Sequence, residues 1–170
     1  MDDERRHRRT RPAEDRTQVL VGIDPSPCAT RALGWAAREA RLRRAALHVV
    51  HVYTEASPPR GYLPMTSASS PSGGMHRRDA EDLVDGAARA VAGEGLEVTA
   101  EAIAGRPESV LVRLSSDADL LVVGSSGHHP LFGLLLGSVA QHCVRHARCP
   151  VVVVPMAALS GVPDVSPDLA

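Results

Sequence analysis

Three glycines and a serine in the last third of the chain have the types and spacing of a phosphate-binding segment. They are Gly124, Gly127, Gly137 and Ser138, with two residues between the first two glycines and nine before the third. Glycine lets a phosphate approach the main chain closely, and a serine at the start of a helix adds a hydroxyl to the free amides there. At this glycine content such a pattern arises by chance in roughly one chain in a hundred. The signal becomes strong if a strand precedes the segment and a helix follows it.

Two further candidates follow aliphatic runs near the start of the chain. Asp24 could accept hydrogen bonds from ribose hydroxyls or an adenine amine, or approach a phosphate-bound metal. The alternative is that Asp24 and Ser26 shape the turn and cap the next helix. Val52, between His51 and Tyr53, could offer its main chain to an adenine edge and its side chain as an apolar contact. An ordinary buried strand end is the alternative there.

The elements that must position these residues are short aliphatic runs separated by helical patterns. Runs of this length that are apolar on both faces are typical of parallel strands. A weaker strand alternates apolar and polar residues, which indicates that one of its faces is exposed to solvent and that it lies near a sheet edge. The predicted strands are Val19–Ile23, Leu47–Tyr53, Leu96–Ala104, Leu120–Val123 and Val151–Val154.

Four helical segments alternate with these strands. The first has Ser26 as its N-cap and Pro27 at its first position, and the last runs from Ser138 to about His146. The other two carry apolar stripes from Ala80 to Val91 and after Gly105-Arg-Pro. The alternation predicts an α/β fold, a single doubly wound parallel sheet with helices on both faces. In such a sheet ligands bind beyond the carboxyl ends of the strands, where all the candidate residues fall.

Composition excludes several classes of protein. All 19 basic residues are arginine, which excludes a Walker-A lysine, a Schiff-base lysine and the lysine of a phosphorylated receiver domain. The net charge of −1 and the scarcity of aromatic residues argue against a nucleic-acid partner. No apolar run could span a membrane, and no signal peptide is visible. With three cysteines and no C-x-x-C spacing, we expect a cytoplasmic protein.

The chain of 170 residues is long enough for one domain with short tails. We expect a disordered charged tail over residues 1–17, the α/β domain over 18–156 and a disordered tail over 157–170. Residues 56–74 are rich in Pro, Ser and Gly and are interpreted as a flexible loop inside the domain.

Two rival kinds of site are weaker. His142 and His146, with Cys143 between them, have a spacing compatible with zinc, but surface histidines and a core thiol are the simpler interpretation. A hydrolase would need a nucleophile paired with a base, and no G-x-S-x-G occurs. We therefore predict no catalytic residues and no fast enzyme.

Several ordered motifs together resemble the universal stress protein family. They are Val19-Leu-Val-Gly-Ile-Asp24, Gly-Arg-Pro at 105–107, Ala118-Asp-Leu-Leu-Val-Val-Gly124 and Gly137-Ser-Val-Ala-Gln, and the likeness extends from about Gln18 to Pro155. The G-x2-G-x9-G-S spacing is similar to the ATP-binding signature of that family.

The resemblance implies a Rossmann-like sheet of five strands in the order 3-2-1-4-5 (adenine nucleotide alpha hydrolase-like) and a homodimer, often joined through the last strand. It implies ATP as ligand, commonly with Mg²⁺ or Mn²⁺. The residues that would bind it are, at the nucleoside, Asp24 and Val52 and, along the phosphates, Gly124, Gly127, Gly137, Ser138 and Val139. Another branch of the family lacks the glycine signature and does not bind ATP.

The chain departs from the family pattern inside the first glycine pair. Many similar members carry a basic residue there, whereas this chain has Ser125 and Ser126, followed by His128 and His129. Phosphate charge would then rest on amides, hydroxyls and a metal, with help from a histidine only when it is protonated. Adenosine recognition is less affected by this departure than triphosphate affinity.

The leading hypothesis is an ATP-binding universal stress protein that acts as a nucleotide-dependent regulator or sensor with an unknown protein partner. The first alternative is a dimeric interaction module of the same fold that needs no nucleotide. The second is an enzyme that hydrolyses ATP slowly.

Overall fold

The computed structural model describes residues 17–54, 77–93, 95–126 and 136–156 of the chain. Strands and helices alternate along these residues as the sequence predicts, with one short 3₁₀ turn, η1, after the third helix. The elements are β1 (Gln18–Ile23), α1 (Pro27–Arg43), β2 (Ala46–Tyr53), α2 (Arg77–Val91), β3 (Val98–Ala104), α3 (Pro107–Leu114), η1 (Ser115–Asp117), β4 (Leu120–Gly124), α4 (Ser138–His146) and β5 (Val151–Val154).

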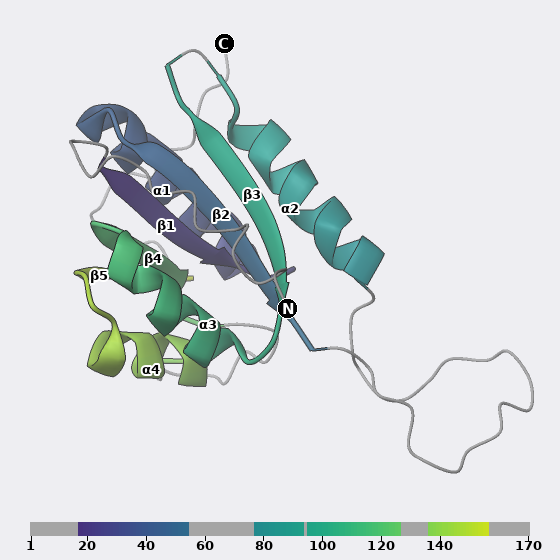
Figure 1. The fold of residues 1–170 in the computed structure, drawn as a ribbon, viewed down its shortest axis with the longest axis vertical. Helices are drawn as coiled ribbons and strands as arrows, with labels where there is room; N and C mark the ends of the chain where they lie inside the picture. Colours follow the sequence, from purple (N-terminus) through teal and green to yellow (C-terminus); the bar gives the residue numbers. More distant parts are fainter. Residues whose placement is uncertain (1–16, 55–76, 94, 127–135, 157–170) are drawn as a thin grey trace, which may run out of the picture.

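The five strands form one parallel sheet in the order β3-β2-β1-β4-β5 (Figure 1). The predicted doubly wound α/β fold and its strand order are therefore confirmed. The chain passes from β1 to β2 on one side of the sheet's centre and from β4 to β5 on the other side. The topological switch therefore lies between β1 and β4. Because all the strands are parallel, their carboxyl ends meet at one edge, where ligands bind in such sheets.

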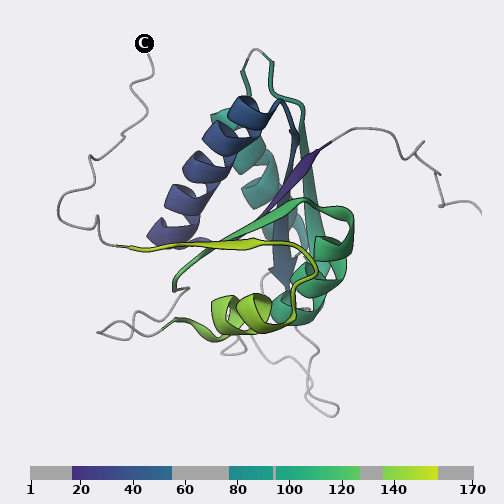
Figure 2. The same ribbon diagram turned by 90° about the vertical axis from the view of Figure 1, so that its left-hand side faces the viewer.

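Helices cover both faces of the sheet, and each face has its own apolar core. Figure 2 shows α1 and α2 on one side and α3 and α4 on the other. Along β1, Val19, Val21 and Ile23 pack toward α1 and α2, whereas Leu20 packs toward α3 and α4. This alternation along an aliphatic run is what a sheet covered on both faces requires.

The strand β3 lies at an edge of the sheet, as its alternating sequence predicts. Its residues alternate between partly buried and exposed positions, with Glu101 on the exposed side. The strand begins at Val98, two residues later than the sequence pattern indicates. Leu96 is nevertheless buried and joins the core under α1 and α2 from the preceding turn.

The start of α1 follows the predicted capping pattern. Ser26 is extended and accepts a hydrogen bond from the Ala29 amide at 3.2 Å, and Pro27 occupies the first helical position. The helix ends at Arg43 and is capped by Arg44, which has a left-handed backbone (φ 54°) and whose amide reaches back to the last turn. The capped start fixes the path of the chain just after β1.

Residues 1–16, 157–170 and the predicted loop 56–74 lie outside the described part of the chain. Among the helices that are described, none has the length and apolar character needed to cross a bilayer.

Candidate functional site

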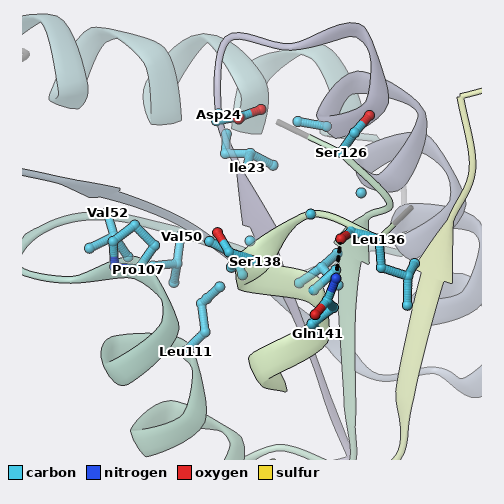
Figure 3. A pocket seen from close by; sticks show the side chains of 17 residues that line it. Ile23, Asp24, Val50, Val52, Pro107, Leu111, Ser126, Leu136, Ser138 and Gln141 are labelled. Atoms are coloured by element: carbon cyan, nitrogen blue, oxygen red, sulfur yellow. Dashed lines mark hydrogen bonds between the residues drawn. The ribbon is translucent and has the colours of Figure 1, made fainter. Parts of the chain in front are cut away.

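A pocket of about 580 Å³ opens at the carboxyl ends of the strands, beside the switch between β1 and β4 (Figure 3). Its lining comes mainly from the carboxyl-terminal parts of β1, β2 and β4 and from the amino-terminal halves of α1, α3 and α4. Small-molecule sites of this size are typically apolar with a few polar groups that orient the ligand. This pocket has the same character.

One wall is made of aliphatic side chains from β2 and α3. Val50 and Val52 of β2 lie on the same side of the pocket as Pro107 and Leu111 of α3 (Figure 3). A side chain at Gly22 would place its Cβ 2.8 Å from Leu111 Cδ1, so glycine at this position leaves the room that Leu111 occupies. These side chains offer a ligand an apolar contact and carry no hydrogen-bonding groups.

Asp24 stands at the end of β1 and lines the same pocket. Its Oδ1 accepts hydrogen bonds from the Ser26 amide at 3.1 Å and from the Ser26 hydroxyl. The capping role expected of Asp24 and Ser26 is therefore present. It coexists with a position on the pocket wall, where the carboxylate can accept hydrogen bonds from a ligand.

Gly124, the last residue of β4, packs against the first turn of α1. An added Cβ would lie 2.9 Å from Cys28 Cβ and 3.2 Å from the Cys28 carbonyl carbon. Cys28 is fully buried, and its sulfur lies 3.3 Å from the Ser126 hydroxyl. Glycine is thus required here by the approach of a helix, in addition to any approach of a phosphate.

The first turn of α4 forms the opposite wall. Gly137 is the N-cap, and Ser138 is the first helical residue, with its hydroxyl facing the pocket interior (Figure 3). The Gly137 amide donates to the Ser125 carbonyl at 2.7 Å, and Gln141 Nε2 donates to the Leu136 carbonyl at 2.6 Å. The first bond joins the two ends of the glycine segment, and the second holds Leu136 against the helix, whose free amides and dipole favour an anion.

The structure brings most of the predicted site residues into this one pocket, while Gly127 lies outside the described residues. The predicted residues that line the pocket are Asp24, Val52, Gly124, Gly137, Ser138 and Val139. Sequence reasoning missed Pro107 and Leu111 as lining residues. The signal that could have found them was Gly105-Arg106-Pro107, because it marks a helix that starts at the same edge of the sheet.

The rival zinc site finds no support in the described residues, which contain no group of three His, Cys, Asp or Glu side chains able to hold a metal. The His142 and His146 rings stack at 4.2 Å, and His146 Nδ1 lies 2.9 Å from the His142 carbonyl. Burial, with smaller effects of Glu108 and Cys149, raises the pKa of Cys143 to about 11. A high pKa disfavours the thiolate that zinc requires.

The sequence matches the model of the universal stress protein family over residues 16–155. A universal stress protein of Mycobacterium tuberculosis (strain H37Rv) is 36% identical over 143 residues, which cover 80% of this chain and 46% of that protein. One of Mycobacterium bovis is 32% identical over 150 residues, covering 81% of this chain and 47% of the relative. The chain thus spans about half the length of these curated relatives.

Solved structures of the family share the fold. A universal stress protein from Archaeoglobus fulgidus in complex with dAMP is 26% identical, with a TM-score of 0.57, covering 81% of this chain and 97% of the other. A universal stress protein in complex with cAMP is 27% identical, with a TM-score of 0.58, covering 83% and 98%. With a family match across the whole described fold, the chain belongs to the universal stress protein family.

Proposed function

We propose that the pocket binds an adenine nucleotide and that the protein acts as a nucleotide-dependent regulator in a stress response. The observation that carries this proposal is the pocket itself, which joins an apolar wall, the Asp24 carboxylate and the first turn of α4 at the switch point of the sheet. Complexes of solved family members with dAMP and cAMP support the same ligand class.

The glycine signature makes ATP, with Mg²⁺ or Mn²⁺, the first candidate ligand. Asp24 is the acidic side chain of the described lining, and no cluster of three metal-binding side chains occurs in the described part of the chain. The residues therefore fit a cation that is held mainly by the phosphates with at most one or two protein ligands, as is usual for Mg²⁺. Such an ion would neutralise phosphate charge in the pocket.

Binding without fast turnover is the activity we propose. Asp24 is the one ionisable side chain among the described residues that line the pocket. Within the described lining, the hydroxyls of Ser126 and Ser138 have no histidine or lysine beside them, so that part of the pocket contains no pair of nucleophile and base of the kind that covalent catalysis uses.

We further propose a cytoplasmic homodimer joined through β5, with a regulatory protein partner. The strand β5 forms an edge of the described sheet, and Val151, Val152 and Val153 are each only partly buried. An aliphatic edge strand of this kind offers free main-chain groups and apolar surface to a second copy.

One observation favours the alternative of a nucleotide-independent module. Gly124 is explained by its contact with Cys28 without any phosphate, so part of the glycine signature has a structural role. The two functions differ in whether nucleotide binds at all.

Titration calorimetry with ATP, ADP and AMP in the presence of Mg²⁺ separates these functions. We expect saturable binding by the wild-type protein and binding weakened by about tenfold or more in Asp24→Ala and Gly137→Val. Absence of heat at millimolar nucleotide would eliminate the nucleotide-dependent regulator. A phosphate-release assay on the same samples should give well under about one turnover per second, and faster turnover would favour an enzyme.

A further inference from the structure

His51 is a buried histidine near the carboxyl end of β2, among aliphatic side chains. It is 5% exposed, and the two preceding residues on the same face of the strand, Leu47 and Val49, are fully buried in the core that α1 and α2 cover. Residues two apart on a strand share a face, so the ring enters the same layer. A polar ring in such a layer needs hydrogen-bond partners that its aliphatic neighbours do not need.

One ring nitrogen of His51 is bonded to the neighbouring strand. Nδ1 lies 2.8 Å from the Ile23 carbonyl oxygen, and because a carbonyl only accepts, Nδ1 carries the proton and donates. The other nitrogen, Nε2, is buried and has no hydrogen-bond partner in the part of the chain that the structure describes. An aliphatic side chain would fill this position without burying an unpaired nitrogen. Core packing alone therefore gives no reason for a histidine here.

The hydrogen bond lies at the point where β1 leaves the sheet. Ile23 and His51 are the last pair in the register between β1 and β2. The Ile23 carbonyl belongs to the peptide unit that joins Ile23 to Asp24, and His51 directly precedes Val52. Asp24 and Val52 both line the pocket (Figure 3). The ring thus links the two strand ends that carry the expected nucleoside contacts.

The position of Asp24 is therefore held from two directions. After Asp24, the Ser26 amide donates to its Oδ1 at 3.1 Å, which orients the carboxylate toward the start of α1. Before Asp24, the His51 ring holds the carbonyl of the preceding peptide unit. Because that unit is planar, holding its oxygen also restricts the Asp24 amide and Cα. Groups that bind a ligand must be held within about half an ångström of the productive geometry, so this restraint bears on affinity.

We propose that His51 is a positioning residue of the nucleotide pocket. By donating to the Ile23 carbonyl, its imidazole holds the Asp24 carboxylate at the place, relative to Val52, where a nucleoside meets both residues. His51 is not among the described residues that line the pocket, so its effect on the ligand passes through Asp24. The inference rests on the proposed function, because it concerns the same pocket.

Calorimetry with AMP on variants of His51 tests the role of the Nδ1 donor. His51→Asn places an amide nitrogen close to the position of Nδ1 and should bind AMP within about twofold of the wild type. His51→Leu and His51→Gln fill the position without a donor at that point and should bind AMP about three- to tenfold more weakly. The matched control is His48→Leu, the same substitution three residues earlier on β2, which should leave the affinity unchanged.

Thermal unfolding of the same variants separates this role from a structural one. Because His51→Leu removes the unpaired Nε2 along with the Nδ1 donor, its melting temperature should stay within about 4 °C of the wild type while its affinity falls. Wild-type affinity for AMP in folded His51→Leu would overturn the proposal. Should His51→Leu fail to fold, His51→Asn and His51→Gln carry the test, and equal affinities in these two variants would overturn it.

The tautomer of His51 can be measured in the unmodified protein. Long-range ¹H–¹⁵N NMR spectra should show Nδ1 protonated and Nε2 unprotonated, as donation to the Ile23 carbonyl requires. A proton on Nε2 with Nδ1 bare would remove the donor and overturn the proposal.

A double-mutant cycle tests whether His51 acts through Asp24. In the Asp24→Ala background, His51→Leu should weaken AMP by less than about twofold, because the carboxylate that His51 positions is already absent. Losses that multiply fully in the double variant would overturn the proposal and leave the nucleotide pocket intact. Absence of AMP binding by the wild-type protein would instead refute the proposed function, and this inference with it.

Discussion

The contact between Gly124 and the first turn of α1 makes a direct prediction for Gly124→Ala. The new Cβ would lie 2.9 Å from Cys28 Cβ and 3.2 and 3.3 Å from the Cys28 carbonyl carbon and oxygen. Two of these three atoms are main chain, so no change of rotamer relieves the overlap. Either the end of β4 or the start of α1 must move by about half an ångström to restore ordinary contact distances.

The expected cost follows from two opposing effects. Overpacking of this kind lowers the free energy of unfolding by about 1–3 kcal/mol. Replacing glycine by alanine also restricts the unfolded chain, which raises the free energy of unfolding by about 0.4–1 kcal/mol. We therefore expect a net loss of about 1–2 kcal/mol in the free energy of unfolding. For a domain of this size the melting temperature should fall by about 2–8 °C.

Urea and thermal unfolding of the purified variants measure this loss. Gly86→Ala is the matched control, because Gly86 lies within α2 and has no atom within 4 Å of an added Cβ. The free energy of unfolding of Gly86→Ala should rise by up to about 1 kcal/mol, because alanine favours the helix more than glycine does. Combining Gly124→Ala with Cys28→Ala should not restore stability, since the Cβ and main chain of residue 28 remain. Wild-type stability in Gly124→Ala, or full recovery in the double variant, would refute the packing argument.

Two further predictions concern residues outside the pocket. Ser115→Ala should lower the free energy of unfolding by about 1–3 kcal/mol, because it removes two hydrogen bonds of a fully buried hydroxyl. The Ser115 hydroxyl donates to the Val112 carbonyl at 2.7 Å and accepts from the Arg148 amide at 2.9 Å. Ser116→Ala, at an exposed hydroxyl, should change stability by less than about 0.5 kcal/mol in the same urea titration, and equal losses would contradict the assignment. The raised pKa of Cys143 predicts that stability falls as the pH rises from about 9 to about 11, because the unfolded thiol ionises first while the native thiol stays protonated. In urea titrations across this pH range, the free energy of unfolding should fall less steeply with pH for Cys143→Ala than for the wild type. An identical slope would exclude Cys143 as a source of the pH dependence. The chain has no lysine that would titrate in the same range.

Much of the fold could be predicted because its signals are local. Aliphatic runs such as Val19–Ile23 are typical of strands in a sheet covered on both faces, and Ser26-Pro27 is typical of a helix start. The alternation along β3 even placed that strand at an edge. The site residues Asp24 and Ser138 followed from their positions after a strand and before a helix.

What could not be predicted depends on contacts between residues distant in sequence. The sequence around Gly124 does not indicate that this residue must leave room for Cys28, which lies 96 residues earlier. The sequence around Gly22 likewise does not indicate that Leu111 occupies the space beside it. The link from Ser115 to the Arg148 amide is of the same kind. The glycine spacing indicated a phosphate-binding segment, but the partner of the Ser125 amide, the Val154 carbonyl, appears only once β5 is placed beside β4.

The most direct test of the central claim is a ¹H–¹⁵N NMR titration of the ¹⁵N-labelled protein with AMP. If the pocket at the switch point binds adenine nucleotide, saturable shift changes should concentrate on the amides of Val52, Leu111, Ser138 and Val139, which line it. The outer face of α2, which contributes no residue to the pocket, should remain unchanged. Absence of shifts at millimolar AMP, or shifts centred away from these residues, would contradict the account.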